Sequence, residues 1–149
     1  VYAIPLARLF MMSLPEDVLS IANACSTGVD VTSGIVLRNP DMQMATITLS
    51  LHSKQPKRAV LSFDDCYIEV TNYPRADRAT IVWTADGRRE EIRAGEEAYA
   101  LCYEAANLER AVAGDQIEQN MIAYTVDVMA IMTMLRRQWG IRYPEEEQA

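Results

Sequence analysis

The spacing of apolar residues changes twice along the chain and predicts three kinds of segment. Residues 1–12 are apolar apart from Arg8 and predict a helix whose regular part begins near Ile4, because Pro5 is tolerated only in a first turn. Residues 18–93 contain short apolar runs separated by turn residues, which is typical of β-strands. Helical spacing returns in the last third of the chain.

The strand-like runs number seven. The clearest spans residues 44–51, and Asp86-Gly87 between the last two runs is a strong signal for a tight hairpin. In the clearest run, apolar and small polar residues alternate with a period of two: Ala45, Thr46, Ile47, Thr48, Leu49, Ser50 and Leu51. The other runs are residues 18–27, 31–37, 59–63, 67–70, 79–84 and 90–93.

Two helices are predicted after the strands. The first, residues 97–113, carries one apolar stripe and is followed by Gly114, which suits the position after a helix end. Residues 115–120 read as a linker, and the second helix runs from about residue 121 to 138, before Gly140. The stripe of the first helix consists of Leu101, Ala105, Leu108 and Val112.

The last helix is apolar on nearly all sides. A surface helix shows one apolar stripe, so a helix of this kind is expected to be covered on two sides. It is too short to span a bilayer, which takes about 20 apolar residues. One side can face the chain's own sheet, and the other side requires a partner. Its polar residues up to Leu135 are spread around the helical wheel: Thr125, Asp127 and Thr133.

The order of helix, strands and two helices predicts an α+β fold, with a largely antiparallel sheet and helices on one face. With 149 residues, the chain is expected to form a single domain, residues 1–149. The other sheet face carries Thr46, Thr48 and Ser50, a row that is small and only mildly polar. This open face either contacts solvent or pairs with a second copy in a two-fold dimer.

The charge of the chain disfavours two classes of partner. Its formal net charge is −7 and its pI is about 4.7, so it repels nucleic acid and anionic membrane surfaces. The short basic group Lys54, Lys57 and Arg58 is interpreted as a solvated loop.

Residues that could carry chemistry are sparse. Cys25, Cys66 and Cys102 form no C-x-x-C spacing, and they are interpreted as buried, reduced thiols of a cytoplasmic protein. His52 is expected to be solvated at a strand end, and Asp64-Asp65 to serve a turn. No Gly-rich phosphate loop and no metal-ligand spacing is present, so the sequence predicts no metal site and no complete enzyme. Tyr2, at a helix start, normally would be a packing residue.

Several segments, in this order and spacing, resemble the C-terminal domain of the glucose–fructose oxidoreductase / inositol dehydrogenase / MocA family, and above all its dihydrodiol- and sugar-dehydrogenase-like branch. One departure is Asp64-Asp65-Cys66, where family members have a Gly-containing turn. The segments that carry the resemblance are residues 2–9, 27–30, 43–47, 67–70, 103–104, 112–114, 128–132, 138–140 and 143–145.

The resemblance implies an NAD- or NADP-dependent oxidoreductase. In this family an N-terminal Rossmann domain binds the nucleotide, and hydride passes between the nicotinamide and a sugar-like or diol carbon. That domain, with its E-K-P lysine, is absent from residues 1–149, so no cofactor-binding residue is assigned in this chain and the fragment is expected to be inactive alone. The chain opens abruptly at Val1, which is typical of an excised fragment.

The resemblance also implies roles for particular residues. Tyr2 matches the last position of the family's D-x-G-x-[Tyr/His] motif, which faces the substrate, and is the single catalytic candidate, for proton relay or substrate orientation. The open sheet face is expected to form a homodimer. The missing nucleotide domain is expected against the last helix, whose Met129 or Met134 would otherwise be exposed. The alternatives are a stand-alone binding or scaffold domain without activity, and a degenerate family member.

Overall fold

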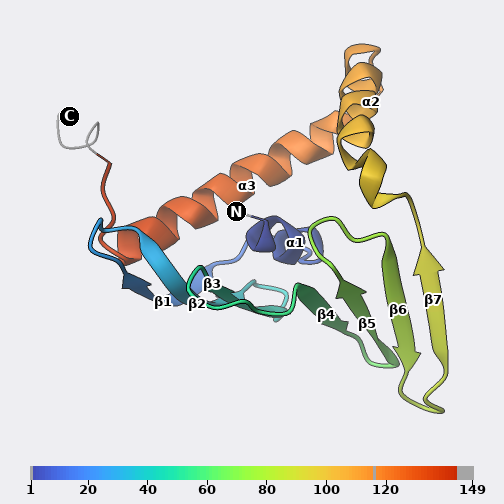
Figure 1. Cartoon of the computed structure of the whole chain (residues 1–149), viewed down its shortest axis with the longest axis horizontal. Coiled ribbons are helices and arrows are strands. Elements are labelled where there is room, and N and C mark those ends of the chain that lie inside the picture. The colour runs from blue at the N-terminus through green and yellow to red at the C-terminus, as the bar shows by residue number, and fades with distance from the viewer. Residues whose placement is uncertain (1, 116, 144–149) are drawn as a thin grey trace. The chain divides into compact units, whose positions relative to one another are not determined.

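The computed structural model describes residues 2–115 and 117–143 (Figure 1). Val1, Gln116 and residues 144–149 lie outside the described residues, as do the expectations for the abrupt start and for the last two residues of the 143–145 motif. The elements in chain order are α1 (Ala3–Leu9), β1 (Asp17–Ala24), β2 (Asp30–Arg38), β3 (Met44–Ser50), β4 (Arg58–Ser62), β5 (Cys66–Thr71), β6 (Arg78–Trp83), β7 (Arg89–Arg93), the 3-10 helix η1 (Glu97–Tyr99), α2 (Ala100–Val112) and α3 (Ile117–Gln138).

The predicted α+β class is confirmed, and every predicted strand is present. The strands form two antiparallel sheets: a first sheet in the order β1-β2-β3 and a second sheet in the order β4-β5-β6-β7. The chain divides into two compact units, Val1–Gln55 with Ile117–Ala149, and Pro56–Gln116. Each unit therefore contains one of the two sheets.

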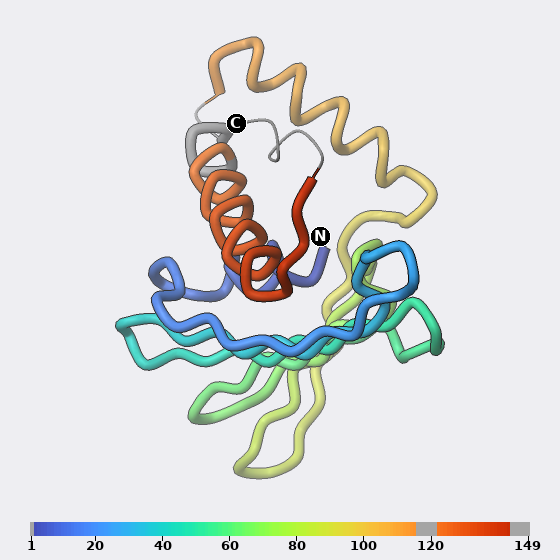
Figure 2. The backbone as a smooth tube through the Cα atoms, turned by 90° about the vertical axis from the view of Figure 1, so that its left-hand side faces the viewer, coloured from blue at the N-terminus to red at the C-terminus, as the bar shows by residue number. Residues whose placement is uncertain are grey.

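The core of the first unit lies between the first sheet and two helices. The alternation predicted for residues 44–51 holds within β3, since Ala45, Ile47 and Leu49 pack against this core while Thr46 and Thr48 are exposed. It is wrong for Leu51, which follows the end of the strand and is exposed. Figure 2 shows α3 running along one side of the first sheet. The fully or nearly buried members of the core are Ile4, Met11, Val18, Ile35, Leu37, Val128, Ile131 and Leu135.

The predicted helix ends are partly right. Gly114 follows α2 and Gly140 follows α3, and both have the positive φ that suits a residue after a helix end. The linker predicted at residues 115–120 is wrong, because α3 begins at Ile117. The first turn of α3 was not predicted, because the polar residues at 118–120 interrupt the apolar pattern of the rest of the helix.

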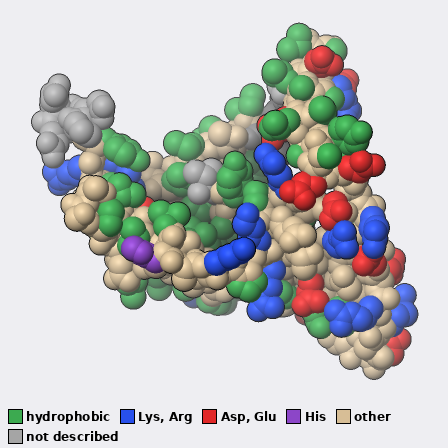
Figure 3. Space-filling model, in the orientation of Figure 1, with side chains coloured by type: hydrophobic (Ala, Val, Ile, Leu, Met, Phe, Trp, Pro, Cys, Tyr) green, Lys and Arg blue, Asp and Glu red, His purple; other side chains and the backbone are tan. Residues whose placement is uncertain are grey.

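The second unit has a charged edge and an exposed helix. Every residue of the edge strand β7 is exposed, and charged side chains gather around this strand in Figure 3. Such charges protect a sheet edge from pairing with another chain. Within this unit α2 contacts η1, and its apolar stripe is exposed: Leu101, Ala105, Leu108 and Val112.

Candidate functional site

Tyr2 stands at the N-terminal end of α1. Its side chain is 67% exposed and its carbonyl oxygen accepts a hydrogen bond from the backbone N–H of Leu6 at 3.4 Å. The phenol is therefore exposed on this chain and is not part of its core. The catalytic role of Tyr2 stays a prediction.

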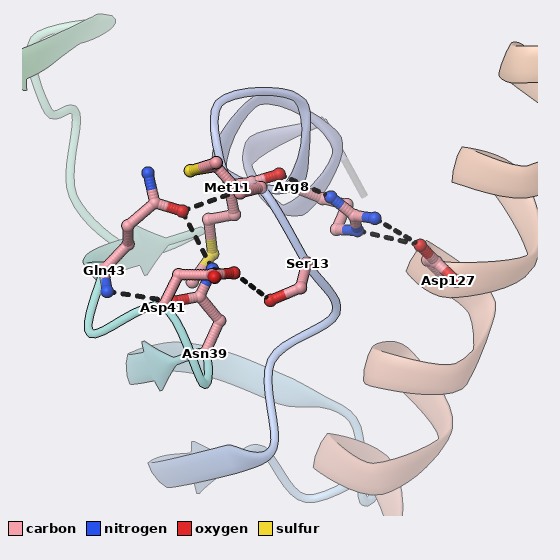
Figure 4. A network of polar contacts seen from close by, with 8 residues as sticks. Arg8, Met11, Ser13, Asn39, Asp41, Gln43 and Asp127 are labelled. Carbon is pink, nitrogen blue, oxygen red and sulfur yellow. Dashed lines mark hydrogen bonds and ion pairs between the residues drawn. The ribbon is translucent and has the colours of Figure 1, made fainter.

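The helix that carries Tyr2 is joined to α3 by an ion pair. The Nε and Nη2 atoms of Arg8 both lie 2.8 Å from Oδ2 of Asp127 (Figure 4). A third donor of the same guanidinium, Nη1, bonds the carbonyl oxygen of Met11 at 2.7 Å. The guanidinium also stacks over the ring of Tyr124, 4.8 Å from its centroid. The Arg8 side chain is only 11% exposed and that of Asp127 is 25% exposed, so solvent screens this pair less than an exposed one.

The segment that follows the C-terminal end of α1 is held by the turn between β2 and β3. Buried Asn39 donates through Nδ2 to Oε1 of Gln43 at 2.8 Å and accepts from the Gln43 backbone N–H at 2.9 Å. The same Oε1 atom accepts from the backbone N–H of Met12 at 2.7 Å, just after α1. Ser13 donates to Asp41 at 2.5 Å, as Figure 4 shows. These contacts tie the segment that follows α1 to the edge of the first sheet.

Sequence reasoning did not connect Arg8 with Asp127. The two residues are 119 positions apart, which hides the pair from any local pattern. A signal was present nevertheless, because each is the only charged residue of its apolar segment, residues 1–12 and 121–135. A buried charge requires a partner, so two lone opposite charges in apolar helices are candidates for each other.

The open face of the first sheet combines exposed apolar and small polar side chains. Leu19 is 68% exposed, Ile21 is 80% exposed and Met44 is 65% exposed. Thr46 and Thr48 of the predicted row are exposed, and Ser50 is half-buried. Strand pairing aligns Ile21 with Gly34 and Thr48, so a large apolar side chain stands beside small residues on this face. A shallow groove there is lined by residues that include Ile21, Asn23, Thr32, Gly34, Thr48 and Ser50.

One side of α3 is exposed, as the apolar pattern predicted. Ile131 and Leu135 are buried against α1 and the first sheet, whereas Ile122, Val126 and Met129 are each more than half exposed. The expected exposure of Met129 or Met134 is therefore met by Met129, whereas Met134 is half-buried against the core. Its position three residues after Ile131 places it beside the covered stripe of the helix.

The remaining candidate residues occupy turns and surfaces. His52 is exposed just after β3, and Asp64-Asp65 is an exposed bend between β4 and β5, both as predicted. Lys54 and Lys57 are exposed loop residues, also as predicted, whereas Arg58 of the same group is exposed but begins β4, so its loop assignment is wrong. Within residues 2–115 and 117–143, no group of three or more His, Cys, Asp or Glu residues lies together in a way that could hold a metal ion. No helix in the same ranges is long and apolar enough to cross a membrane.

The cysteines differ in burial. All three are free thiols, but Cys102 is exposed on α2, so the prediction that the thiols are buried is wrong for this residue. Cys25 is half-buried in the turn after β1, where Sγ lies 2.8 Å from Oγ1 of Thr27. The hydrogen bond from Thr27 lowers the pKa of the Cys25 thiol below its ordinary value of 9.0.

Gly95 and the start of η1 do not form a cradle for a dinucleotide. Such a cradle needs glycines without side-chain neighbours and free backbone N–H groups at a helix N-terminus. Gly95 precedes η1, but a Cβ placed on it would meet the ring of Tyr103 at 3.3 Å. The hydroxyl of Tyr103 also accepts from the backbone N–H of Glu96 at 3.0 Å. This helix start is thus filled by the chain itself and flanked by the carboxylates of Glu96 and Glu97.

Comparison with known proteins finds a sequence relative and solved structures with a similar fold. The chain is 30% identical over 139 residues to scyllo-inositol 2-dehydrogenase (NADP(+)) IolU of Bacillus subtilis (strain 168), covering 92% of this chain and 42% of the relative. Two structures of UDP-N-acetylglucosamine 3-dehydrogenase GnnA from Acidithiobacillus ferrooxidans, each 18% identical, match with TM-scores of 0.70 and 0.56. They cover 88% and 87% of this chain and 43% and 45% of GnnA. No family model matches the chain.

The resemblance to the C-terminal domain of the glucose–fructose oxidoreductase / inositol dehydrogenase / MocA family is thereby confirmed. Within this family resemblance, the match to GnnA shows the fold alone, because its sequence identity is low. The chain spans less than half the length of the proteins that it matches.

Proposed function

We propose that this chain is the substrate-binding and dimerising part of an NAD(P)-dependent dehydrogenase that oxidises a hydroxyl of a sugar-like molecule or diol. The observation that carries the proposal is the match of 92% of the chain to a protein named as an NADP-dependent inositol dehydrogenase. The exposed phenol of Tyr2 supports it, because the family resemblance assigns the substrate-facing position to this residue. The parent enzyme is proposed to be cytoplasmic, which agrees with three free cysteines.

Tyr2 is proposed to relay a proton or to orient the substrate. When an alcohol is oxidised to a carbonyl, its oxygen gives up a proton, and a phenol within hydrogen-bond reach can accept or relay that proton. A phenol does so near neutral pH only when a nearby cation favours its ionised form. The family resemblance assigns that cation to a lysine outside this chain, whereas the guanidinium of Arg8 is engaged by Asp127.

The nucleotide-binding domain is proposed to lie outside these 149 residues and to contact α3. The exposed stripe formed by Ile122, Val126 and Met129 supplies an apolar surface for such a domain. Burial of this stripe would complete the two-sided cover that its composition requires.

The open face of the first sheet is proposed to form a homodimer. Leu19 and Ile21 of β1 and Met44 of β3 are exposed on this face. The central strand carries Gly34 on this face, and small residues there allow two faces to approach closely. A two-fold axis would place the same residues opposite each other, which suits a face of mixed apolar and hydroxyl groups.

The proposal is tested with the full-length gene product and a panel of inositols, sugars and diols. Reduction of NADP or NAD is followed by absorbance for the native protein and for Tyr2→Phe. We expect turnover with at least one polyol, and a kcat lowered about 100-fold or more in Tyr2→Phe, since proton transfer by a positioned side chain contributes about 10²–10⁴-fold. The control is Tyr99→Phe, an exposed tyrosine of η1, which should keep native turnover. Normal turnover in Tyr2→Phe would remove the assignment, and no turnover with any polyol would favour a scaffold domain or a degenerate member.

A further inference from the structure

All three nitrogen atoms of the Arg8 guanidinium have a partner. The guanidinium uses Nε and Nη2 on one carboxylate oxygen and Nη1 on the carbonyl oxygen of Met11. The ring of Tyr124 covers the planar face of the cation. Planar donors used in this way fix the direction of a guanidinium as well as its position.

The helix that this pair holds has little stability of its own. α1 has seven residues, and no side chain caps its N-terminus. An isolated helix shorter than about 12 residues is marginal in water, so the position of α1 depends on tertiary contacts. Ile4 supplies the only buried side chain within the helix, and Met11 follows beyond its end. These contacts are apolar and define direction poorly compared with a planar ion pair.

Arg8 and Tyr2 lie at opposite ends of α1, so a change in the direction of the helix moves Tyr2. Arg8 lies in the last turn, where the contact of Gln43 with Met12 also holds the chain. Tyr2 lies at the opposite end, about 9 Å along the axis at a rise of about 1.5 Å per residue. A small rotation about the fixed end therefore displaces the phenol more than it displaces Arg8.

We infer that Arg8 and Asp127 form a positioning pair, which holds α1 against α3 and thereby sets the place of the Tyr2 phenol at the substrate. The inference rests on the proposed function of Tyr2. Neither Arg8 nor Asp127 touches the substrate in this scheme. The pair acts through the orientation of the short helix, and its loss leaves nucleotide binding intact because the nucleotide site lies outside these residues.

The test uses the full-length protein with 3-fluorotyrosine placed at Tyr2 alone, in the native background and in Asp127→Asn. The asparagine keeps the size of the side chain but removes the charge that orders the guanidinium. We expect the fluorine resonance of Tyr2 to shift or broaden, and kcat to fall about 10- to 100-fold, because a misplacement of about 1 Å can cost about 100-fold in rate. The KM for NADP should stay unchanged.

Two further variants keep the result interpretable. Arg8→Lys retains the positive charge but not the planar fork, so its kcat should lie between those of the native protein and Asp127→Asn. It also replaces Asp127→Asn if that variant does not fold. Asp115→Asn is the matched control, because Asp115 pairs with Arg110 at 2.9 Å on the exposed α2. This control should change neither the Tyr2 resonance nor kcat.

The outcomes separate this inference from the proposed function. If Tyr2→Phe impairs turnover while Asp127→Asn and Arg8→Lys leave the resonance and kcat at native values, the positioning role is refuted and the role of Tyr2 stands. If Tyr2→Phe has native turnover, the proposed role of Tyr2 fails and the positioning role fails with it. A shifted resonance with a lowered kcat and a constant KM for NADP supports both.

Discussion

Replacing Ile21 with alanine is expected to weaken the proposed dimer about 20- to 400-fold. Ile21 of β1 is 80% exposed on the open face of the first sheet, so a dimer through this face would bury most of its side chain. Full burial of an isoleucine contributes about 1.5–3 kcal/mol. Because only the exposed 80% of Ile21 can become buried in the dimer, and alanine loses about three-quarters of the side-chain carbons, one copy loses about 0.9–1.8 kcal/mol. A two-fold interface contains the residue twice, which gives about 1.8–3.6 kcal/mol.

The assay is sedimentation equilibrium of the full-length protein over a concentration series. Leu51→Ala is the matched control, because Leu51 is also 80% exposed but lies after the end of β3, outside the alternation of that face. We expect the dimer dissociation constant to rise for Ile21→Ala and to stay at its native value for Leu51→Ala. Equal dissociation constants for the native protein and Ile21→Ala, or equal weakening by both variants, would refute the placement of the interface.

Three further predictions concern stability and reactivity. In a denaturant titration, Ile131→Ala should lower the free energy of unfolding by about 2–5 kcal/mol, because Ile131 is fully buried. Met129→Ala should lower it by less than about 1 kcal/mol, because Met129 is 55% exposed. Similar losses in the two variants would show that both sides of α3 are packed. Gly87→Ala should lower thermal stability by about 1 kcal/mol or more, because Gly87 has a φ of 70° in the hairpin turn, and an unchanged melting temperature would argue against this turn. Thr27→Val should slow alkylation of Cys25 at neutral pH, because the Thr27 hydroxyl lowers the pKa of this thiol. A lowered pKa raises the fraction of reactive thiolate at pH values below the ordinary pKa of 9.0. An unchanged alkylation rate would contradict the contact.

The strands could be read from the sequence because their signals are local. The period of two in β3 and the Asp86-Gly87 turn each depend on neighbouring residues, and both appear in the structure. The division of the strands between two sheets was not predictable in this way, because it depends on whether β3 and β4 pair. Consecutive strands of similar composition leave that choice open.

Less of the candidate site than of the fold could be predicted from the sequence. Tyr2 was reached through resemblance, and its exposure is now known. The contacts that hold its helix were missed, because Arg8 and Asp127 meet only when the two ends of the chain pack together. Exposure of Cys102 on α2 was missed for a related reason: composition favours burial of a thiol, but the packing of the helix decides it.

Isothermal titration of NADP and of NAD into the 149-residue chain and into the full-length gene product tests the proposed function most directly. It asks whether the chain belongs to a dehydrogenase whose nucleotide site lies outside these residues. Binding of one nucleotide to the full-length protein, with none to the 149-residue chain, is the predicted result. Tight binding to the short chain would reveal a nucleotide site among these residues, and absence of binding to both proteins would contradict the dehydrogenase assignment.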